Sequence, residues 1–257
     1  MNPNYLCIGV QKSGTTSLIN YLNQNPDIFM KKNESHFFDK PISKEGMKAY
    51  KKSFITKKPL VGEKTPSYCY LRYAIDQIYK FNKNMKLIII LREPISRAYS
   101  HFNMDKQKGK NSKIIKSDDD IVKFFRNQEN DKLTNKTWYR AIGENMAHLI
   151  RGYYDEILKY IFSKFPRENV YIGISEEINK DKLKYYNEIF TFLGARKLKK
   201  IDENLNTHIR TYSNKIPNSL ERYLYNIYKS HNEELYKILG KKINIWEDYY
   251  NKIKKEP

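Results

Sequence analysis

Short runs of apolar residues mark the segments of this chain that a fold would bury as strands. Continuous apolar segments of strand length occur at residues 5–10 (YLCIGV), 87–91 (LIIIL) and 170–174 (VYIGI), with a weaker one at 60–62 (LVG). Continuous rather than alternating apolar runs are typical of strands that are covered on both faces, as in a parallel sheet. The pattern therefore predicts a mainly parallel sheet.

Helical periodicity fills the stretches between these runs. A short apolar face at residues 18–22 stops before Pro26, and residues 146–165 carry apolar side chains at three- and four-residue spacing. Two further helices are expected at 219–230 and 232–239. Strands that alternate with helices indicate an α/β fold of three layers, in which helices flank a central sheet.

One polar segment interrupts this alternation. Residues 105–136 are rich in charged side chains, with one short helix expected near 119–126, and we interpret the segment as an insertion over the sheet edge. The chain of 257 residues shows neither an internal repeat nor a change of composition along its length. We therefore predict a single domain over residues 1–257.

The composition is that of a globular chain with a strong positive charge. Hydrophobic residues make up 40% of the sequence and aromatic residues 14%, which argues against a disordered chain. The net charge of +19 favours anionic partners, such as phosphorylated cofactors or acidic glycans. The basic residues are spread along the whole chain, without the clustered stripe or the module of a nucleic-acid-binding protein. No specific nucleic-acid partner is predicted.

Cysteine usage and the N-terminus bear on the compartment. Cys7 lies in an apolar run, as a buried thiol would, and its distance from Cys69 fits neither a zinc site nor a disulfide framework. No apolar stretch reaches the ~18 residues of a membrane span. The opening MNPNYLCIGV lacks the basic lead-in of a signal peptide. We expect a cytoplasmic protein with reduced thiols and no membrane anchor.

The segment GVQKSGTT at residues 9–16 nearly fits a nucleotide-binding P-loop. Gly9 and Gly14 keep the four-residue gap of the Walker A pattern, and Thr16 occupies its hydroxyl position. The lysine position holds Thr15, while Lys12 lies three residues earlier. In NTPases that missing lysine contacts the terminal phosphates of the nucleotide. A strand, a tight loop and a helix start still form an anion-binding unit, so the loop suits a donor without a γ-phosphate.

A second candidate anion site follows the strand at 87–91. Arg92 comes directly after this strand, at the edge where open α/β sheets bind ligands. Arginine can bind a phosphate through two parallel hydrogen bonds, and Ser100, two helical turns on, can donate another. The competing interpretations are an ion pair of Arg92 with Glu93 or Asp105, and a plain surface position for Ser100. Two phosphate sites on one sheet indicate a nucleotide with phosphate at both ends of its ribose.

These residues belong to a longer series of motifs. In chain order the motifs are QKSGTTSL, ESHFFD, GEKTPSY, LREPISRAYSHF, HLIRGYYDEILKYIFSKFPRENVYIGISEEI and NEELYKILGKKINIW. The series resembles the sulfotransferases that use 3′-phosphoadenylyl sulfate (PAPS), above all their carbohydrate, heparan-sulfate-type branch and its bacterial relatives. The resemblance covers nearly the whole chain. It implies a P-loop NTPase-like fold, PAPS as sulfuryl donor and the desulfated nucleotide PAP as product.

The resemblance also implies which residues hold the donor. The 5′-phosphosulfate loop would consist of Lys12, Ser13, Gly14, Thr15 and Thr16. Arg92 and Ser100 would bind the 3′-phosphate that distinguishes PAPS from ATP. Arg210 and Lys215, within HIRTYSNKIP, are the candidates for the basic loop that closes over the nucleotide late in the family sequence.

The motif ESHFFD is the expected source of the catalytic base. The resemblance places Glu34 in this role, since a carboxylate can accept the proton of a hydroxyl or an amine. His36 stays open as an alternative base, the role of a histidine in the cytosolic small-molecule branch, or as a residue that assists Glu34. In an extended segment the two side chains would face the same side with Phe38, while Phe37 and Asp39 would face the other.

Two lysines are expected to stabilise the leaving group. Lys64, in GEKTPSY, would stand near the sulfuryl group, as the resemblance implies, and Lys12 lies in the loop. By analogy with phosphoryl transfer, positioning and charge stabilisation should dominate the catalysis. Two ammonium groups can take the place of a metal ion here, so no metal is predicted.

The reaction expected from the sequence is transfer of a sulfuryl group to a hydroxyl or an amine. A saccharide is the expected acceptor, because of the basic charge and the likeness to the glycan branch, and residues 105–136 are expected on the acceptor side. The alternative function is a P-loop kinase or NTPase-like phosphotransferase. Thr15 in place of the loop lysine counts against that alternative.

Overall fold

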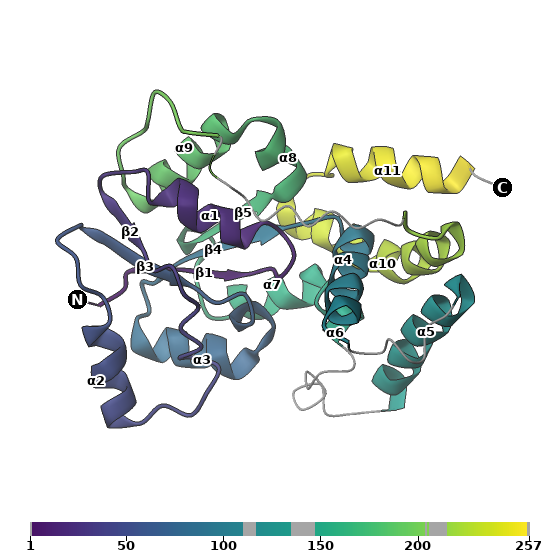
Figure 1. Cartoon of the computed structure of the whole chain (residues 1–257), viewed down its shortest axis with the longest axis horizontal. Helices are drawn as coiled ribbons and strands as arrows, with labels where there is room; N and C mark the ends of the chain where they lie inside the picture. The colour runs from purple at the N-terminus through teal and green to yellow at the C-terminus, as the bar shows by residue number, and fades with distance from the viewer. Residues whose placement is uncertain (1, 110–116, 135–146, 204, 206–214, 256–257) are drawn as a thin grey trace. The chain divides into compact units, whose positions relative to one another are not determined.

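The computed structural model describes residues 2–109, 117–134, 147–203, 205 and 215–255 (Figure 1). The chain divides into two compact units. Unit 1 comprises Met1–Arg92 and Tyr160–Ile209, and unit 2 comprises Glu93–Lys159 and Arg210–Pro257. The single domain over 1–257 stays a prediction.

Unit 1 is built on a sheet of five parallel strands. The strands lie in the order β2-β3-β1-β4-β5, and each neighbouring pair is parallel. Their bounds are β1 Tyr5–Gly9, β2 Ile28–Met30, β3 Leu60–Lys64, β4 Lys86–Leu91 and β5 Val170–Ile174. β1 is the central strand, and all of its residues are buried, as expected of a parallel strand covered on both faces.

The apolar runs of the sequence correspond to four of these five strands. The runs at 5–10, 87–91 and 170–174 form β1, β4 and β5, and the weaker run at 60–62 forms part of β3. The prediction of a mainly parallel sheet is therefore confirmed. β2 was missed because three residues are too few to show a pattern.

Helices cover both faces of the sheet of unit 1. They are α1 Thr15–Leu22, α2 Lys44–Lys52, α3 Arg72–Phe81, α8 Ser175–Lys180 and α9 Lys182–Leu193, with 3-10 turns at Tyr68–Tyr70 and Arg167–Asn169. α1, α8 and α9 share one apolar core with β1, β2 and β4. Figure 1 shows α3 on the opposite side of the sheet from α1 and α9. The predicted fold class, a three-layer α/β fold with flanking helices, is confirmed.

The parallel pairing of β1 with β3 decides what lies at the carboxyl edge of the sheet. Tyr5 is opposite Gly62, and Cys7 is opposite Lys64. Lys64 therefore ends β3 close to the level at which β1 ends at Gly9. Because open α/β sheets bind ligands beyond the carboxyl ends of their strands, this edge is the natural place for a site.

Unit 2 is helical. Its helices are α4 Pro94–Gln107, α5 Asp118–Thr134, α6 Ala147–Ile150, α10 Asn218–Leu239 and α11 Asn244–Lys255, and α7 Tyr154–Phe162 begins here and ends in unit 1. The helix expected at 146–165 breaks between α6 and α7 near Gly152, because glycine is a poor helix former. The helices expected at 219–230 and 232–239 form one, α10, since neither glycine nor proline separates them. α11 was not expected.

The described parts of the polar segment 105–136 contain more helix than we expected of an insertion. α4 continues to Gln107, with Asp105 buried on it, and α5 extends the helix expected at 119–126 in both directions. Residues 110–116 and 135–136 lie outside the described residues. Asp105 thus belongs to a helix of the core rather than to a surface insertion.

A buried carboxylate holds the start of α4. Glu93 accepts hydrogen bonds from the N–H groups of Ile95 (2.9 Å) and Ser96 (2.6 Å), and Pro94 occupies the first turn. The Tyr250 hydroxyl of α11 donates to Oε1 of Glu93 (2.9 Å). Burial raises the pKa of Glu93, and these donors oppose the rise. The contact ties α11 to the start of α4.

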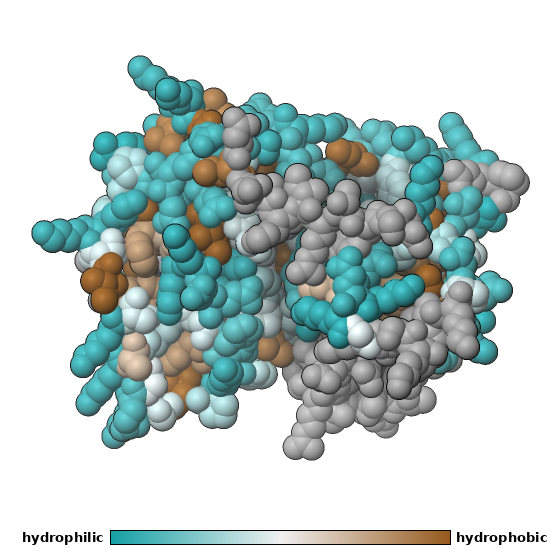
Figure 2. Space-filling view, viewed as in Figure 1, coloured by the Kyte–Doolittle hydropathy of each residue, from teal (hydrophilic) through white to brown (hydrophobic). Residues whose placement is uncertain are grey.

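The surface and the thiols agree with the composition. The described residues on the face in Figure 2 are mainly hydrophilic, and the large hydrophobic side chains exposed among the described residues are Ile55 and Tyr73. Within the same described ranges, no helix is both long and apolar enough to cross a membrane. Cys7 and Cys69 are both buried, and no disulfide joins them. Burial raises the pKa of the Cys7 thiol to about 12, as expected of an inert thiol.

The close contact of Gly62 with Tyr5 gives a test of the β1–β3 register. A Cβ at position 62 would lie 2.4 Å from ring atoms of Tyr5, and overpacking of this kind costs about 1–3 kcal/mol. We expect Gly62→Ala to lower the free energy of unfolding by that amount, as measured by urea unfolding. Tyr5→Val removes the ring that the new methyl group would meet. The double variant should therefore lose less free energy of unfolding than the sum of the two single variants. Strict additivity would contradict the contact.

Candidate active site

The turn between β1 and α1 has the backbone of an anion-binding loop. Lys12 (φ 76°) and Gly14 (φ 81°) adopt the left-handed region, which glycine reaches without strain. α1 begins at Thr15 without a side-chain cap, so its first N–H groups have no intrahelical partner. Oγ of Ser13 is buried and has no hydrogen-bond partner among the described residues. Such donors at a helix N-terminus suit a phosphate.

Arg92, directly after β4, supports this loop. Its Nη1 donates to the carbonyl oxygen of Lys12 at 3.0 Å, where the backbone has the uncommon positive φ. The contact confirms that Arg92 lies at the carboxyl edge of the sheet, as the sequence indicated. Its role in binding a 3′-phosphate stays a prediction.

Lys64, at the end of β3, connects the loop to the predicted base. Its Nζ lies 2.7 Å from Oε1 of Glu34 and 3.5 Å from Oγ1 of Thr16. The Lys64 side chain is 5% exposed and that of Glu34 is 36% exposed, so the ammonium group is largely withdrawn from water while the carboxylate stays open to it. The structure therefore brings together the predicted base, the predicted lysine and the loop hydroxyl.

His36 lies between two carboxylates. Its Nε2 is 3.2 Å from Oε2 of Glu34, and its Nδ1 is 2.6 Å from Oδ2 of Asp39. The Ser67 hydroxyl donates to the same oxygen of Asp39 (2.8 Å). The imidazole therefore contacts the predicted base on one side and Asp39 on the other. The role of His36, as base or as assistant to Glu34, stays a prediction.

The segment that carries Glu34 and His36 is held in place by two buried residues, Thr65 and Glu63. The N–H groups of Ser35 (3.2 Å) and His36 (3.3 Å) donate to Oγ1 of Thr65. The Thr65 hydroxyl in turn donates to Oε2 of Glu63 at 2.8 Å. Glu63 is wholly buried, and burial raises the pKa of its carboxyl to about 7. The segment of Glu34, the predicted base, is thus positioned by the two residues that flank Lys64 in the sequence.

The expected alternation of faces in this segment is wrong in part. Glu34 and His36 do come together, but His36 has φ 45°, so the segment is not extended there. Asp39 consequently contacts His36 instead of facing away. Phe37 stacks on Tyr50 with ring centroids 4.0 Å apart, and Phe38 is fully buried.

Two of the remaining predicted donor ligands, Ser100 and Lys215, belong to unit 2. Ser100 is buried on α4, in unit 2. Lys215, also in unit 2, is exposed, and its carbonyl oxygen accepts a hydrogen bond from the Tyr99 hydroxyl (3.2 Å). Arg210 lies outside the described residues. The roles of these three in binding the nucleotide stay predictions.

Sequence reasoning missed the residues that hold the base. Glu63 and Thr65 both fall in the motif GEKTPSY, and Asp39 falls in ESHFFD. The signal was therefore in the quoted motifs, but hydrogen bonds between two distant motifs are not visible in either one alone.

Comparison with known proteins identifies the family. The model of the sulfotransferase domain family matches residues 2–249, so the chain belongs to the sulfotransferase domain family. The resemblance inferred from the motifs is confirmed, and the kinase or NTPase alternative is not favoured.

Curated relatives with detectable similarity include sulfotransferases named for heparan sulfate. The chain is 37% identical to mouse heparan sulfate glucosamine 3-O-sulfotransferase 5 over 103 residues, which is 39% of this chain and 30% of the relative. It is 28% identical to human heparan sulfate glucosamine 3-O-sulfotransferase 3B1 over 201 residues, which is 76% of this chain and 47% of the relative. The chain thus spans less than half the length of these relatives.

A solved structure has the same fold. The sulfotransferase from Alicyclobacillus acidocaldarius matches with a TM-score of 0.73 and 22% identity, covering 96% of this chain and 99% of the other. At this identity the match shows the fold alone.

The buried Glu63 gives a prediction about stability and pH. Its pKa is about 7 in the folded chain, against about 4.3 in an unfolded one. Between these values the folded chain holds a proton that the unfolded chain has released, so this group makes stability fall as pH rises, with no further loss above about 7. Glu63→Gln removes the titration. We expect urea unfolding of this variant to show a shallower loss of stability between pH 5 and 7 than the parent chain.

Glu45→Gln serves as a matched control, because Glu45 is exposed on α2. Its pH profile should follow that of the parent chain. Parallel profiles for Glu63→Gln and the parent would contradict a raised pKa for Glu63.

Proposed function

We propose that this chain transfers the sulfuryl group of PAPS to a hydroxyl or an amine of a saccharide, with Glu34 as the catalytic base. One observation carries the proposal. The Glu34 carboxylate contacts Lys64 at 2.7 Å, and the same ammonium group reaches the loop hydroxyl of Thr16 at 3.5 Å. A proton acceptor and a leaving-group cation thus lie side by side at an anion-binding loop, as base-assisted sulfuryl transfer would use them.

The proposed reaction is an in-line displacement at sulfur. Glu34 takes the proton of the acceptor O–H or N–H, and the freed electron pair forms a bond to sulfur. The bond between sulfur and the bridging phosphate oxygen breaks, and its electron pair stays on that oxygen as PAP leaves. Lys64 and Lys12 stabilise the negative charge that develops there. The residues supply this charge themselves, so no step requires a metal.

The donor site is proposed to follow the family pattern. Residues 12–16 would bind the 5′-phosphosulfate, since the α1 N-terminus lacks a side-chain cap and the buried hydroxyl of Ser13 has no partner among the described residues. Arg92 and Ser100 are proposed to bind the 3′-phosphate, on the strength of the motif LREPISRAYSHF. Lys215 and Arg210 are proposed to contact the nucleotide from the late basic segment.

A saccharide acceptor is supported by the relatives and by charge. The relatives named above are heparan sulfate glucosamine 3-O-sulfotransferases, and the net charge of +19 would attract an acidic glycan. The polar segment 105–136 is proposed to lie on the acceptor side. A cytoplasmic location stays a prediction from the sequence.

Replacing the base tests the proposal. We expect Glu34→Gln to lower the turnover number by about 10²–10⁴-fold, because general base catalysis contributes that much. The affinity for PAP, measured by calorimetry, should stay within a small factor of the parent value, since the phosphate donors are untouched. Turnover can be followed as transfer of labelled sulfate from PAPS to heparan-type oligosaccharides.

Glu45→Gln, which changes a glutamate on α2 in the same way, is the control and should keep full turnover. Thermal unfolding of both variants separates a loss of chemistry from a loss of fold. Full turnover in Glu34→Gln would remove Glu34 from the role of base.

A further inference from the structure

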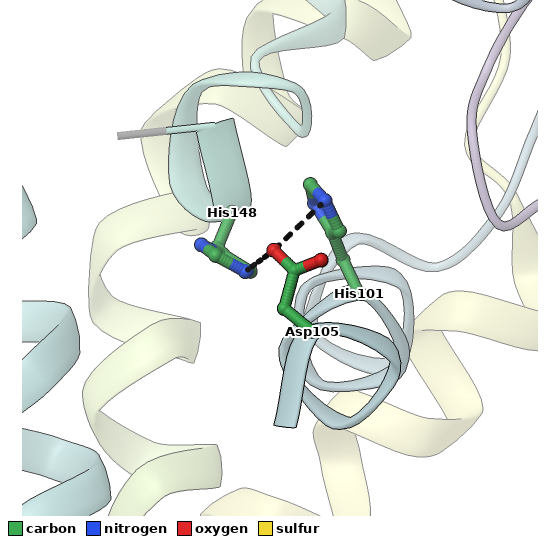
Figure 3. Close-up of side chains that lie close together, drawn as sticks. All are labelled: His101, Asp105 and His148. Carbon is green, nitrogen blue, oxygen red and sulfur yellow. Dashed lines mark ion pairs between the residues drawn. The ribbon is translucent and has the colours of Figure 1, made fainter. Parts of the chain in front are cut away.

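Three buried side chains of unit 2 point at one another, although none has a part in the proposed transfer reaction. His101 and Asp105 lie one turn apart on the same face of α4, and His148 comes from α6 (Figure 3). All three are buried, and one potential ligand atom from each lies within 4.8 Å of the other two. Nε2 of His101 is 3.7 Å and Nε2 of His148 is 3.2 Å from the same oxygen, Oδ2 of Asp105.

The two contacts to Oδ2 of Asp105 are poorly formed as hydrogen bonds. A separation of 3.7 Å between nitrogen and oxygen is too long for a hydrogen bond. Nε2 of His148 is nearer to Asp105, yet this buried atom has no hydrogen-bond partner of acceptable geometry among the described residues. By contrast, a tetrahedral zinc ion with bonds of about 2.0–2.1 Å holds its ligand atoms roughly 3.4 Å apart. The observed separations of 3.2 and 3.7 Å bracket that value.

Gln128 of α5 occupies the position of an outer partner of the cluster. Its side-chain amide lies 3.0 Å from Nδ1 of His148, and its Oε1 is buried without a hydrogen-bond partner among the described residues. Nitrogen and oxygen of such an amide are assigned from the hydrogen-bond network. If this amide is flipped, Oε1 of Gln128 accepts a hydrogen bond from Nδ1–H of His148. The lone pair on Nε2 of His148 then faces Asp105. Metal-binding histidines have this arrangement, with the second nitrogen donating to an oxygen.

From this geometry we infer that His101, Asp105 and His148 bind a divalent transition-metal ion of the zinc class. Two imidazole nitrogens and one carboxylate suit such ions, whereas Ca²⁺ and Mg²⁺ prefer oxygen ligands. The inference does not rest on the proposed function, and the ion takes no part in sulfuryl transfer.

The surroundings of the cluster favour a structural ion. The ring centroids of Phe124 and Phe125 lie 5.3 and 6.2 Å from that of His148. The two phenyl rings give the cluster an apolar wall. Arg97, whose Nη2 donates to the carbonyl oxygen of His148, opposes a cation, and the Asp105 carboxylate offsets part of this repulsion.

Such an ion would fasten α6 to α4. α6 has four residues, too few for a helix to be stable by itself. Ligands from two helices, with an outer partner on α5, would cross-link three elements of unit 2. Since an ion that binds the folded chain alone raises its stability, metal binding should appear as a rise in Tm.

Cobalt is the probe for this site. The full chain, without an affinity tag of histidines and after dialysis against a chelator, is titrated with Co²⁺ at neutral pH. We expect the intense visible absorption of four-coordinate cobalt, saturation at a single equivalent, displacement by Zn²⁺ and a higher Tm with either ion. A parent chain with no such absorption and no rise in Tm overturns the inference, and leaves the cluster as a buried polar contact.

Variants locate the ion. His148→Gln and Asp105→Asn should abolish the absorption, and Gln128→Ala should weaken cobalt binding by about 10–100-fold, as expected for an outer partner. His231→Gln is the matched control, because Nδ1 of His231 lies at a normal hydrogen-bond distance of 2.8 Å from Oδ1 of Asp155 in the same unit. Absorption that persists in His148→Gln and Asp105→Asn would place the ion elsewhere, for example at His36, and would overturn the inference.

Discussion

The ion pair between Lys64 and Glu34 is the interaction on which the proposed site depends. Its distance of 2.7 Å follows from the sheet, because parallel pairing of β3 with β1 brings the end of β3 to the level of the loop after Gly9. An antiparallel β3 would put Lys64 at the other edge. The Lys64 ammonium group then contacts both the loop hydroxyl of Thr16 and the carboxylate of Glu34. The register of β3 thus places Lys64, and hydrogen bonds to Thr65 hold the segment of Glu34, the predicted base.

Charge is distributed in this site to suit its proposed chemistry. The loop lacks the Walker lysine, with Thr15 in its place, and the cation comes instead from a neighbouring strand. Glu63, next to Lys64, is wholly buried, and burial raises the pKa of its carboxyl to about 7. Below that pH a protonated Glu63 adds no second negative charge beside Glu34. It still accepts the hydrogen bond of Thr65, which positions the segment carrying the base.

The sequence predicted the features that depend on neighbours along the chain. β1, β4 and β5 are continuous apolar runs, so these strands were found. β2 has three residues and gave no signal. The side of the segment on which Asp39 lies was predicted wrongly, because His36 has a positive φ. The backbone there contacts Thr65, and no local pattern in the sequence contains this contact. The hydrogen bond from Tyr250 to Glu93 likewise joins residues that lie far apart along the chain.

A crystal structure of the complex with PAP tests the central claim most directly, because it locates the 5′-phosphate relative to Lys64. The account predicts that this phosphate lies on the α1 N-terminus, within hydrogen-bond distance of Nζ of Lys64 and of the N–H groups of residues 13–16. A 5′-phosphate bound away from Lys64, with the Lys64–Glu34 pair remote from the nucleotide, would contradict the account.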